Sequence, residues 1–381
     1  MKKLDTVMVI AGVLAILSMI FNPPGKEYLE FIDVRVLCLL FSLMAVIGGL
    51  GREGVFEKIA GILVGKAGSL RMLSGILIGL CFVSSMLITN DVALITFVPM
   101  TLFMLQGCRQ KHLIFVIVLE TIAANLGSML LPFGNPQNLY LYGKYNMQIS
   151  EFVGVMLPYW LLSLGMLAVL LWVLIPGEKL QFGRQGETQD KEGKEMESAV
   201  PEDMKKGRGK RNVVFYVILF LFCICGVLRL VPYYAVTLAV IAAFLVLEPE
   251  VLKKVDYGLL LTFLFFFVFV GNLSRIEAVR EAAGTLLEGR VVLASALISQ
   301  VISNVPAALM LSGFTQDGAG LLLGVNLGGL GTLIASMASL ISYKYYKNAA
   351  GADGKAYFLW FTGLNVLLLV ILLAAQYVLR F

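Results

Sequence analysis

Two short polar segments interrupt otherwise apolar stretches, and their residue types suit the binding of ions. The first is TND at 89–91 within the apolar stretch 82–99, and the second is SNV at 303–305 within 296–311. Carbonyl and hydroxyl oxygens of such residues can hold a hard cation. A helix that begins at such a point turns its free N–H groups and positive dipole end toward the same space, which can hold an anion. Helix capping is the plainer alternative for either segment taken alone.

A second pair of interruptions follows, one in each half of the chain. NLGSMLLPFGNPQNLYLY (125–142) contains Pro132, Gly134 and Pro136, and a regular helix cannot continue through them. NLGGLGTLIASMASLISY (326–343) has three glycines but no proline. Its glycines predict a second unwound helix, with close helix packing as the alternative.

Only two acidic residues, Asp91 and Glu120, lie well inside predicted membrane spans. A charge at a helix centre costs about 2.5–3.5 kcal/mol on insertion scales, so such groups face a cavity, pair with a cation or stay protonated. The sequence therefore predicts a Na⁺ ligand or proton carrier at each. The alternatives are a helix cap for Asp91 and a protonated structural acid for Glu120. The aligned positions in the other half, Val305 and Leu321, are not acidic, so the coupling chemistry is predicted to be asymmetric.

The amino-acid composition indicates that the chain is a membrane protein. Of the 381 residues, 59% are hydrophobic and only 14% are charged, whereas soluble domains carry about 25% charged residues. Apolar runs long enough to cross a bilayer recur along the chain. His112 is the only histidine, and no nucleotide-binding loop is present, which argues against a histidine metal centre and a membrane enzyme. The net charge of +5 comes from loop residues and does not indicate nucleic-acid binding.

A repeat organises the chain. Residues 32–61 align without a gap on 255–284, with Asp33 on Asp256 and Arg52 on Arg275. Basic loop residues place the amino terminus in the cytoplasm and the carboxyl terminus outside, in the plasma (inner) membrane. The two copies then cross the membrane in opposite directions, as in many secondary transporters.

The predicted fold is all-α and polytopic, with two inverted-topology repeats. Its parts are an N-terminal transmembrane helix (1–31), repeat 1 (32–175), a cytoplasmic charged linker (176–212), connecting transmembrane helices (213–254) and repeat 2 (255–381). Each repeat is predicted to hold a re-entrant hairpin, at about 72–106 and 290–315, and a broken helix, at about 112–142 and 319–347. Arms of about a dozen residues in the second hairpin reach roughly 18 Å, too short to cross. The first hairpin has longer arms, and two short spans are its alternative.

The motifs TNDVALITFVP, NLGSMLLPFGNPQN, ISNVPAAL and NLGGLGTLIAS together resemble the ion transporter superfamily. It includes citrate transporter-like permeases, arsenical pump membrane proteins, sodium–proton antiporters and divalent anion:sodium symporters. The resemblance covers nearly the whole chain and implies inverted repeats, usually in a homodimer with an elevator-type mechanism. The symporters carry Ser-Asn-Thr at both hairpin tips, and this chain keeps the asparagines but not the final threonines. The first tip also carries the carboxylate of Asp91, and this charge repels a dianion unless a cation neutralises the carboxylate. The resemblance is therefore stronger to the arsenical-pump, antiporter or uncharacterised branches than to the dicarboxylate symporters.

These observations predict a secondary active transporter for a small anion or oxyanion, coupled to Na⁺ or H⁺, with no other cofactor. A sodium–proton antiporter without an organic substrate is the alternative, and a channel is a third. The expected partners are a small anionic solute, the lipid bilayer and a second copy of the chain. The expected solute-binding residues are Thr89, Asn90, Asn135, Ser303, Asn304, Thr332 and Ser336. The expected cation-coupling residues are Asp91, Glu120, Asn125, Gly134 and Asn326, with a possible Na⁺ at Asn90, Asp91 and Asn125.

Overall fold

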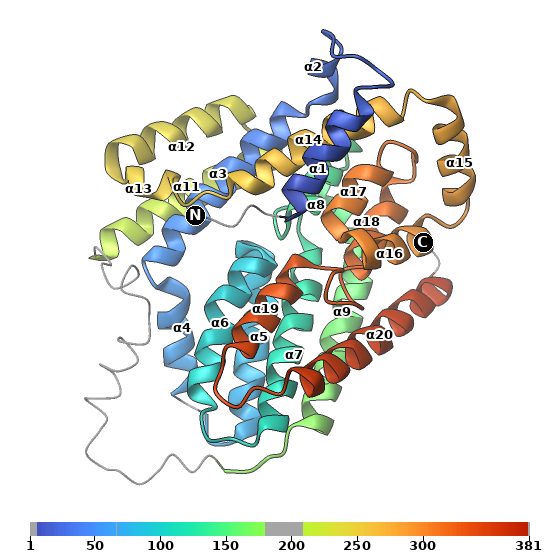
Figure 1. Cartoon of the computed structure of the whole chain (residues 1–381). Helices are drawn as coiled ribbons and strands as arrows, with labels where there is room; N and C mark the ends of the chain where they lie inside the picture. The colour runs from blue at the N-terminus through green and yellow to red at the C-terminus, as the bar shows by residue number, and fades with distance from the viewer. Residues whose placement is uncertain (1–5, 66, 180–208, 380–381) are drawn as a thin grey trace.

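A computed structural model of the chain describes residues 6–65, 67–179 and 209–379. Most of the predicted linker, residues 180–208, lies outside this description, as do the basic residues at the amino terminus. Apart from one isolated bridge between Ser69 and Lys179, all named elements of the described residues are helical (Figure 1).

Two runs of helices make up the described residues. The first contains α1 (Thr6–Ser18), α2 (Tyr28–Phe31), α3 (Val34–Arg52), α4 (Val55–Val64), α5 (Leu70–Ile88), α6 (Asn90–Met104), α7 (Gln110–Gly127), the 3-10 turn η1 (Ser128–Leu130), α8 (Pro136–Lys144) and α9 (Ile149–Leu174). The second contains α11 (Gly209–Val227), α12 (Tyr233–Leu247), α13 (Pro249–Leu252), α14 (Tyr257–Leu273), α15 (Glu277–Leu287), α16 (Val291–Ile302), α17 (Asn304–Leu311), α18 (Gly318–Leu327), α19 (Met337–Lys347) and α20 (Gly354–Leu379).

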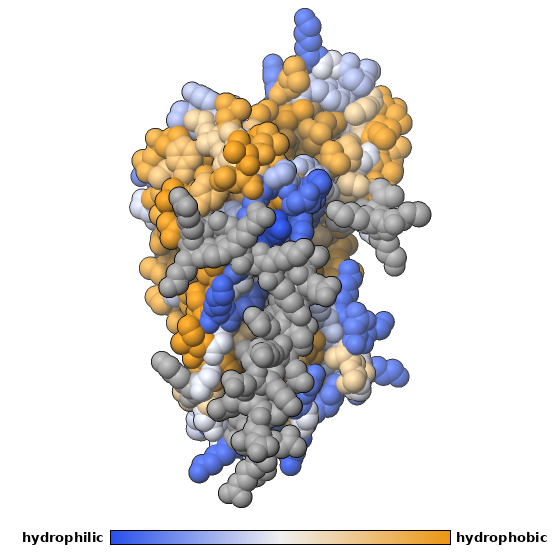
Figure 2. Space-filling view, turned by 90° about the vertical axis from the view of Figure 1, so that its left-hand side faces the viewer, coloured by the Kyte–Doolittle hydropathy of each residue, from blue (hydrophilic) through white to orange (hydrophobic). Residues whose placement is uncertain are grey.

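The outer surface of these helices is suited to lipid. Among the described residues, α3, α5, α9, α20 and the pair α7–η1 are long and apolar enough to cross a membrane, and α14 with α15 is a further candidate, bent by 103°. Apolar side chains on the outer helices face outward, such as Val246 of α12 at 81% exposure and Val370 of α20 at 58%. Apolar residues cover much of the upper part of the face in Figure 2. Soluble monomers rarely expose so much apolar surface, and the prediction of an all-α polytopic membrane protein is confirmed.

Helix α7 lies at the centre of the molecule. Every residue from Leu113 to Gly127 is buried, and α5, α6, α9, α19 and α20 pack around the helix. A helix that is apolar on all sides is expected to be enclosed in this way. The polar residues of this buried stretch, Glu120, Thr121 and Asn125, therefore face other helices and not lipid.

Both polar segments form hairpin tips. Helices α5 and α6 meet at Thr89, and α16 and α17 meet at Ser303. The two tip residues share an unusual backbone conformation, with φ 72° and ψ 152° at Thr89 and φ 74° and ψ 155° at Ser303. A non-glycine residue in such a region stores about 1–3 kcal/mol of strain, and such strain clusters at functional sites.

The second hairpin is too short to cross the bilayer. Helix α16 has 12 residues and α17 has 8, so they extend about 18 Å and 12 Å, against about 30 Å of hydrocarbon. Helix α5 has 19 residues and by length alone can reach across, at about 28 Å.

Both predicted broken helices are interrupted. Helix α7 ends at Gly127 and α8 begins at Pro136; helix α18 ends at Leu327 and α19 begins at Met337. The second segment lacks proline, and its chain nevertheless leaves the helix. In Figure 1 the first hairpin and α7 lie in the lower part of the molecule, and the second hairpin and α18 in the upper part.

Equivalent contacts recur at the aligned positions of the two halves. Asp33 caps α3 by accepting from the Val36 N–H at 3.0 Å, and Asp256 caps α14 by accepting from Leu259 at 3.0 Å. Arg52 pairs with Glu248 at 3.5 Å, and its counterpart Arg275 pairs with Glu27. A structural repeat requires such matches; the opposite orientation of the two copies stays a prediction.

Close packing of α7 on α5 depends on Gly127. A Cβ atom at this residue would lie 2.1 Å from the Phe82 carbonyl oxygen, whereas a Cβ at Gly79 of α5 would meet nothing within 4 Å. We expect Gly127→Ala to destabilise the fold by roughly 1–3 kcal/mol through overpacking, and Gly79→Ala to be neutral or slightly stabilising. Melting curves of the purified protein in detergent measure both. Equal melting temperatures would show that α5 and α7 do not pack as described.

Candidate functional site

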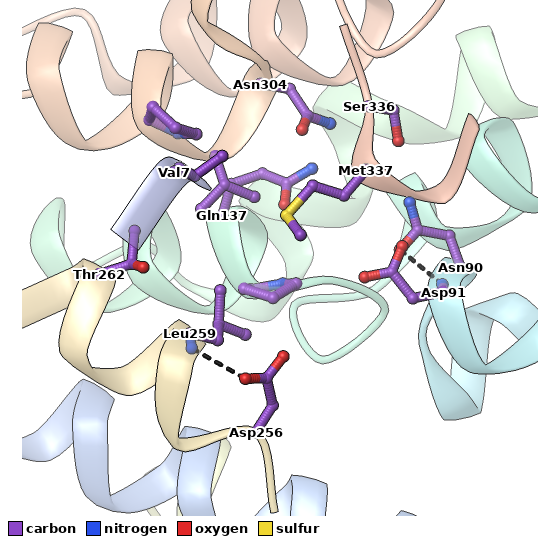
Figure 3. Close-up of a pocket in the computed structure, with 13 residues that line it drawn as sticks. Val7, Asn90, Asp91, Gln137, Asp256, Leu259, Thr262, Asn304, Ser336 and Met337 are labelled. Carbon is purple, nitrogen blue, oxygen red and sulfur yellow. Dashed lines mark hydrogen bonds between the residues drawn. The ribbon is translucent and has the colours of Figure 1, made fainter. Parts of the chain in front are cut away.

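A small cavity lies where the two hairpin tips meet the two helix breaks (Figure 3). It is lined by Val7, Asn90, Asp91, Pro136, Gln137, Asp256, Leu259, Thr262, Asn304, Val305, Pro306, Ser336 and Met337. Its volume is about 40 Å³, and one water needs about 10–15 Å³. The cavity therefore has room for a few water-sized groups. The side chains of Asn90 and Asn304, far apart in the sequence, reach the same space.

Four of the helix starts at this cavity come from the hairpin tips and the helix breaks. Its lining includes Asn90 at the start of α6, Asn304 at the start of α17, Pro136 at the start of α8 and Met337 at the start of α19. The first N–H groups of a helix have no partner within the helix, and the macrodipole places about half a positive charge at that end. Four such ends around one small space make it favourable for an anion.

Three of these helix starts lack the usual side-chain cap. The residues before α6, α17 and α19 are Thr89, Ser303 and Ser336. Among the residues that the structure describes, none of these three side chains accepts a hydrogen bond from an N–H of the helix that follows it. Asn135, before α8, does cap its helix by accepting from the Asn138 N–H at 3.1 Å. The uncapped starts leave only some N–H groups for a bound solute. The Asp91 N–H donates to Asn90 Oδ1, and the Asn304 N–H donates to the Ala335 carbonyl at 3.0 Å. Pro136 in α8 and Pro306 in α17 have no N–H.

Two carboxylates face the same cavity. Asp91 comes from α6, and Asp256 comes from the start of α14 on the other side (Figure 3). None of the described residues that line the space is a lysine or arginine. The described residues also contain no group of three or more His, Cys, Asp or Glu side chains that could hold a metal ion. The cavity thus combines N–H donors from helix starts with carboxylate acceptors.

Asn125 joins the first hairpin tip to the second break. Its Oδ1 accepts from Asn90 Nδ2 at 3.0 Å and from Ser336 Oγ at 2.9 Å. Its Nδ2 donates to Ser339 Oγ at 3.4 Å. One buried amide at the end of α7 therefore holds α6 and α19 together beside the cavity.

Asn326 makes the corresponding contacts from the other half. Its Oδ1 accepts from Asn135 Nδ2 at 3.3 Å, and its Nδ2 donates to Asn138 Oδ1 at 2.6 Å. In the sequence alignment Asn125 corresponds to Asn326, and the pair Ser336 and Ser339 corresponds to Asn135 and Asn138. Each asparagine thus binds the equivalent pair of polar residues in the opposite half.

Two further amides, Asn138 and Gln300, satisfy the carbonyl groups that the breaks leave free. Asn138 Nδ2 donates to the carbonyls of Ser128, Met129 and Leu131, each at 3.3 Å. Gln300 Nε2 donates to the carbonyls of Gly328 at 3.0 Å and Leu330 at 2.9 Å. Sequence analysis missed both as functional residues. The sequence signal that could have identified Gln300 is a single amide side chain within an otherwise apolar arm, ALISQVIS, since a polar group at membrane depth needs a partner.

The predicted solute-binding residues separate into three groups. Asn90, Asn304 and Ser336 line the cavity. The strained tip residues and the amide of Asn135 lie beside it. Thr332 instead holds the second break, since its N–H donates to Gln300 Oε1 at 2.9 Å and its Oγ1 to the Gln300 carbonyl at 3.0 Å.

The predicted cation-coupling residues are also divided. Asp91 reaches the cavity, and Asn125 and Asn326 belong to the amide network. Gly134 permits a close backbone approach, since a Cβ there would lie 2.0 Å from the Ser128 carbonyl oxygen. Glu120 is fully buried away from the cavity, where its Oε1 accepts from Thr101 Oγ1 at 2.5 Å.

The predicted Na⁺ ligands lie together, but two of their oxygens are engaged. Asn90 Oδ1 accepts from the Asp91 N–H at 3.0 Å. Asn125 Oδ1 accepts two hydrogen bonds. A sodium ion at Asn90, Asp91 and Asn125 would have to replace these bonds, and this site stays a prediction.

The amide network predicts a large loss of stability for two substitutions. Asn125→Ala removes the acceptor for Asn90 and Ser336, and Asn326→Ala removes the partners of Asn135 and Asn138. Each buried group left without a partner costs about 1–3 kcal/mol. Both variants should melt well below the parent protein in detergent, whereas the exposed Asn348→Ala should melt with it. A parent-like melting temperature for Asn326→Ala would contradict the reciprocal arrangement.

The proteins that this chain resembles in sequence include several transporters. The family model for citrate transporters matches residues 1–317. An uncharacterized transporter of Methanocaldococcus jannaschii is 33% identical over 351 residues, 90% of each chain. The inner membrane protein YbiR of Escherichia coli is 28% identical over 322 residues, 84% of this chain and 82% of the relative. The silicon efflux transporter of Oryza sativa is 28% identical over 188 residues, 48% of this chain and 38% of the relative. The chain therefore belongs to the citrate transporter family and is an integral, multi-pass membrane transporter, not an enzyme.

Proposed function

We propose that this chain is a secondary active transporter that binds a small anion or oxyanion in the cavity where four helices begin. The observation that carries the proposal is the convergence of the starts of α6, α8, α17 and α19 on one space. Their N–H groups and dipoles favour negative charge. Transport then follows by alternating access of an elevator type, in a homodimer of the inner membrane with a cytoplasmic amino terminus and an external carboxyl terminus.

The size of the cavity favours a compact solute. At about 40 Å³ it fits a few water-sized groups, which suits an inorganic oxyanion or oxyacid better than a large tricarboxylate. The family is named for citrate, and one relative is named for the efflux of silicon.

The two carboxylates of the cavity imply a coupling cation. An anion beside Asp91 and Asp256 is repelled unless Na⁺ or H⁺ neutralises part of their charge. Binding of the cation and the solute would then be mutually favourable, as coupled transport requires. Glu120 is a second candidate for proton binding because it is fully buried and its Oε2 has no hydrogen-bond partner among the described residues.

Sodium–proton antiport without an organic substrate is a second candidate function. The observation that favours it is the pair of carboxylates, Asp91 and Asp256, in a cavity whose described lining holds no lysine or arginine. Such a site can bind either a cation or protons. A trapped pH dye that responds to Na⁺ alone, with no flux of any anion, would favour this function over anion transport.

Asn90 and Asn304 should be required for solute flux. Each places an amide at the start of a helix that faces the cavity. We expect Asn90→Ala and Asn304→Ala to reduce uptake into proteoliposomes at least tenfold, about 1.4 kcal/mol of lost interaction, with Asn348→Ala as the unaffected control. The assay uses labelled citrate, arsenite, phosphate and silicic acid under Na⁺ and pH gradients. Parent-like uptake by both cavity variants would contradict the proposed site.

Replacement of Glu120 by glutamine separates coupling from solute binding. Glutamine keeps the shape of the side chain and an oxygen for Thr101 but cannot exchange a proton. If Glu120 carries the coupling proton, Glu120→Gln loses the acceleration of uptake by a pH gradient, while exchange of solute across equal concentrations continues. An unchanged response to the pH gradient would leave Glu120 a purely structural acid.

A further inference from the structure

Gln137 is a buried amide that the fold itself does not explain. It is the second residue of α8, it is 1% exposed, and it lines the cavity. Its Oε1 is enclosed and has no hydrogen-bond partner among the described residues. In Figure 3 the Gln137 side chain lies between Asn304 above and Leu259 below, with Met337 beside it. Buried polar atoms without partners are few in native proteins, so an enclosed carbonyl oxygen on a residue that lines a cavity points to a missing donor.

The surroundings of Gln137 contain further acceptors but few side-chain donors. Asp91 and Asp256 bring two carboxylates to the same cavity, and Met337 offers only a weak sulfur acceptor. Donors come from the N–H groups that remain free at the helix starts. A bound solute must therefore accept hydrogen bonds from the helix starts and also donate at least one to the acceptor side.

Neither a bare cation nor a fully deprotonated anion meets both demands. A cation alone satisfies the oxygens of Gln137 and the carboxylates but leaves the helix N–H groups without acceptors. A fully deprotonated oxyanion satisfies the N–H groups but has no hydrogen for the Gln137 oxygen. A partly protonated oxyacid or a hydroxy acid does both, because it carries acceptor oxygens and at least one hydroxyl group.

We propose that Gln137 determines the specificity of the site by accepting a hydrogen bond from a hydroxyl group of the solute. This inference rests on the proposed function and narrows it to hydroxyl-bearing oxyacids or hydroxy acids. A site whose polar groups would be left unpaired rejects an analogue that lacks the hydroxyl much more strongly than an apolar site can reject an added group. Gln137 is thus a residue that contacts the solute and discriminates between solutes of equal size and charge.

Two matched pairs of solutes test this directly. At a pH where phosphate is mainly the monohydrogen dianion, phosphate and sulfate share charge and tetrahedral shape, but only phosphate carries a hydroxyl. Citrate and tricarballylate likewise differ by a single hydroxyl. We expect the purified full-length protein, titrated calorimetrically at fixed Na⁺, to prefer the hydroxyl-bearing member of at least one pair tenfold or more.

Substitutions at Gln137 identify the acceptor. Gln137→Leu has a similar volume without a polar atom and should reduce the preference to about twofold or less. Gln137→Glu retains an acceptor oxygen and should keep the preference while binding every anion more weakly. Gln106→Leu, at an exposed position, should behave as the parent protein. Melting temperatures without solute establish that each variant is folded.

The outcomes separate this inference from the proposed function. If the parent protein binds neither member of either pair, nor arsenite nor silicic acid, the proposed anion site itself is wrong. If it binds both members of a pair equally, or if folded Gln137→Leu keeps the full preference, anion binding stands and the role of Gln137 is wrong. Loss of the preference in Gln137→Leu together with its retention in Gln137→Glu supports the acceptor role.

Discussion

The structure depends on one constraint, which is that every backbone polar group at membrane depth needs a partner within the protein. The chain leaves the helix after α7 and again after α18, and carbonyl groups become free at both places. Asn138 and Gln300 donate to these carbonyls. Asn125 and Asn326 then tie each break to the opposite half. Unwound backbone is stable here because buried amides replace the water that lipid excludes.

The same interruptions create the chemistry of the cavity. A continuous helix hides its N–H groups in its own hydrogen bonds, whereas a helix that starts in the middle of the protein exposes them. Four starts meet at one space, and the carboxylates of Asp91 and Asp256 face them. Hydrogen-bond donors and acceptors therefore share a single small cavity. This arrangement suits a solute that has both kinds of group, or an anion accompanied by a cation.

The two halves share local features but differ in the side chains that line the cavity. Their hairpin tips have the same strained backbone, at Thr89 and Ser303, and their N-terminal caps have the same geometry. The side chains at the cavity differ, since Asp91 aligns with Val305 and Gln137 with Ala338. Helix starts at aligned positions supply positive ends from both halves, while Asp91 and Gln137 have no residue of the same kind at the aligned positions.

The amino-acid sequence by itself determined the class of protein, the places where the helices break and the family, because prolines, glycines and polar residues in apolar runs are local signals. It also placed Asn90, Asp91 and Asn304 at the two hairpin tips, and in the structure all three line one cavity. It did not identify Gln137, Gln300 or Asp256 as site residues, and it placed Thr332 with the solute-binding residues. Which polar side chain meets which carbonyl is decided only when segments about 200 residues apart pack together. Only the tertiary structure could therefore distinguish the amides that support the backbone from Gln137, which lines the cavity and whose Oε1 has no hydrogen-bond partner among the described residues.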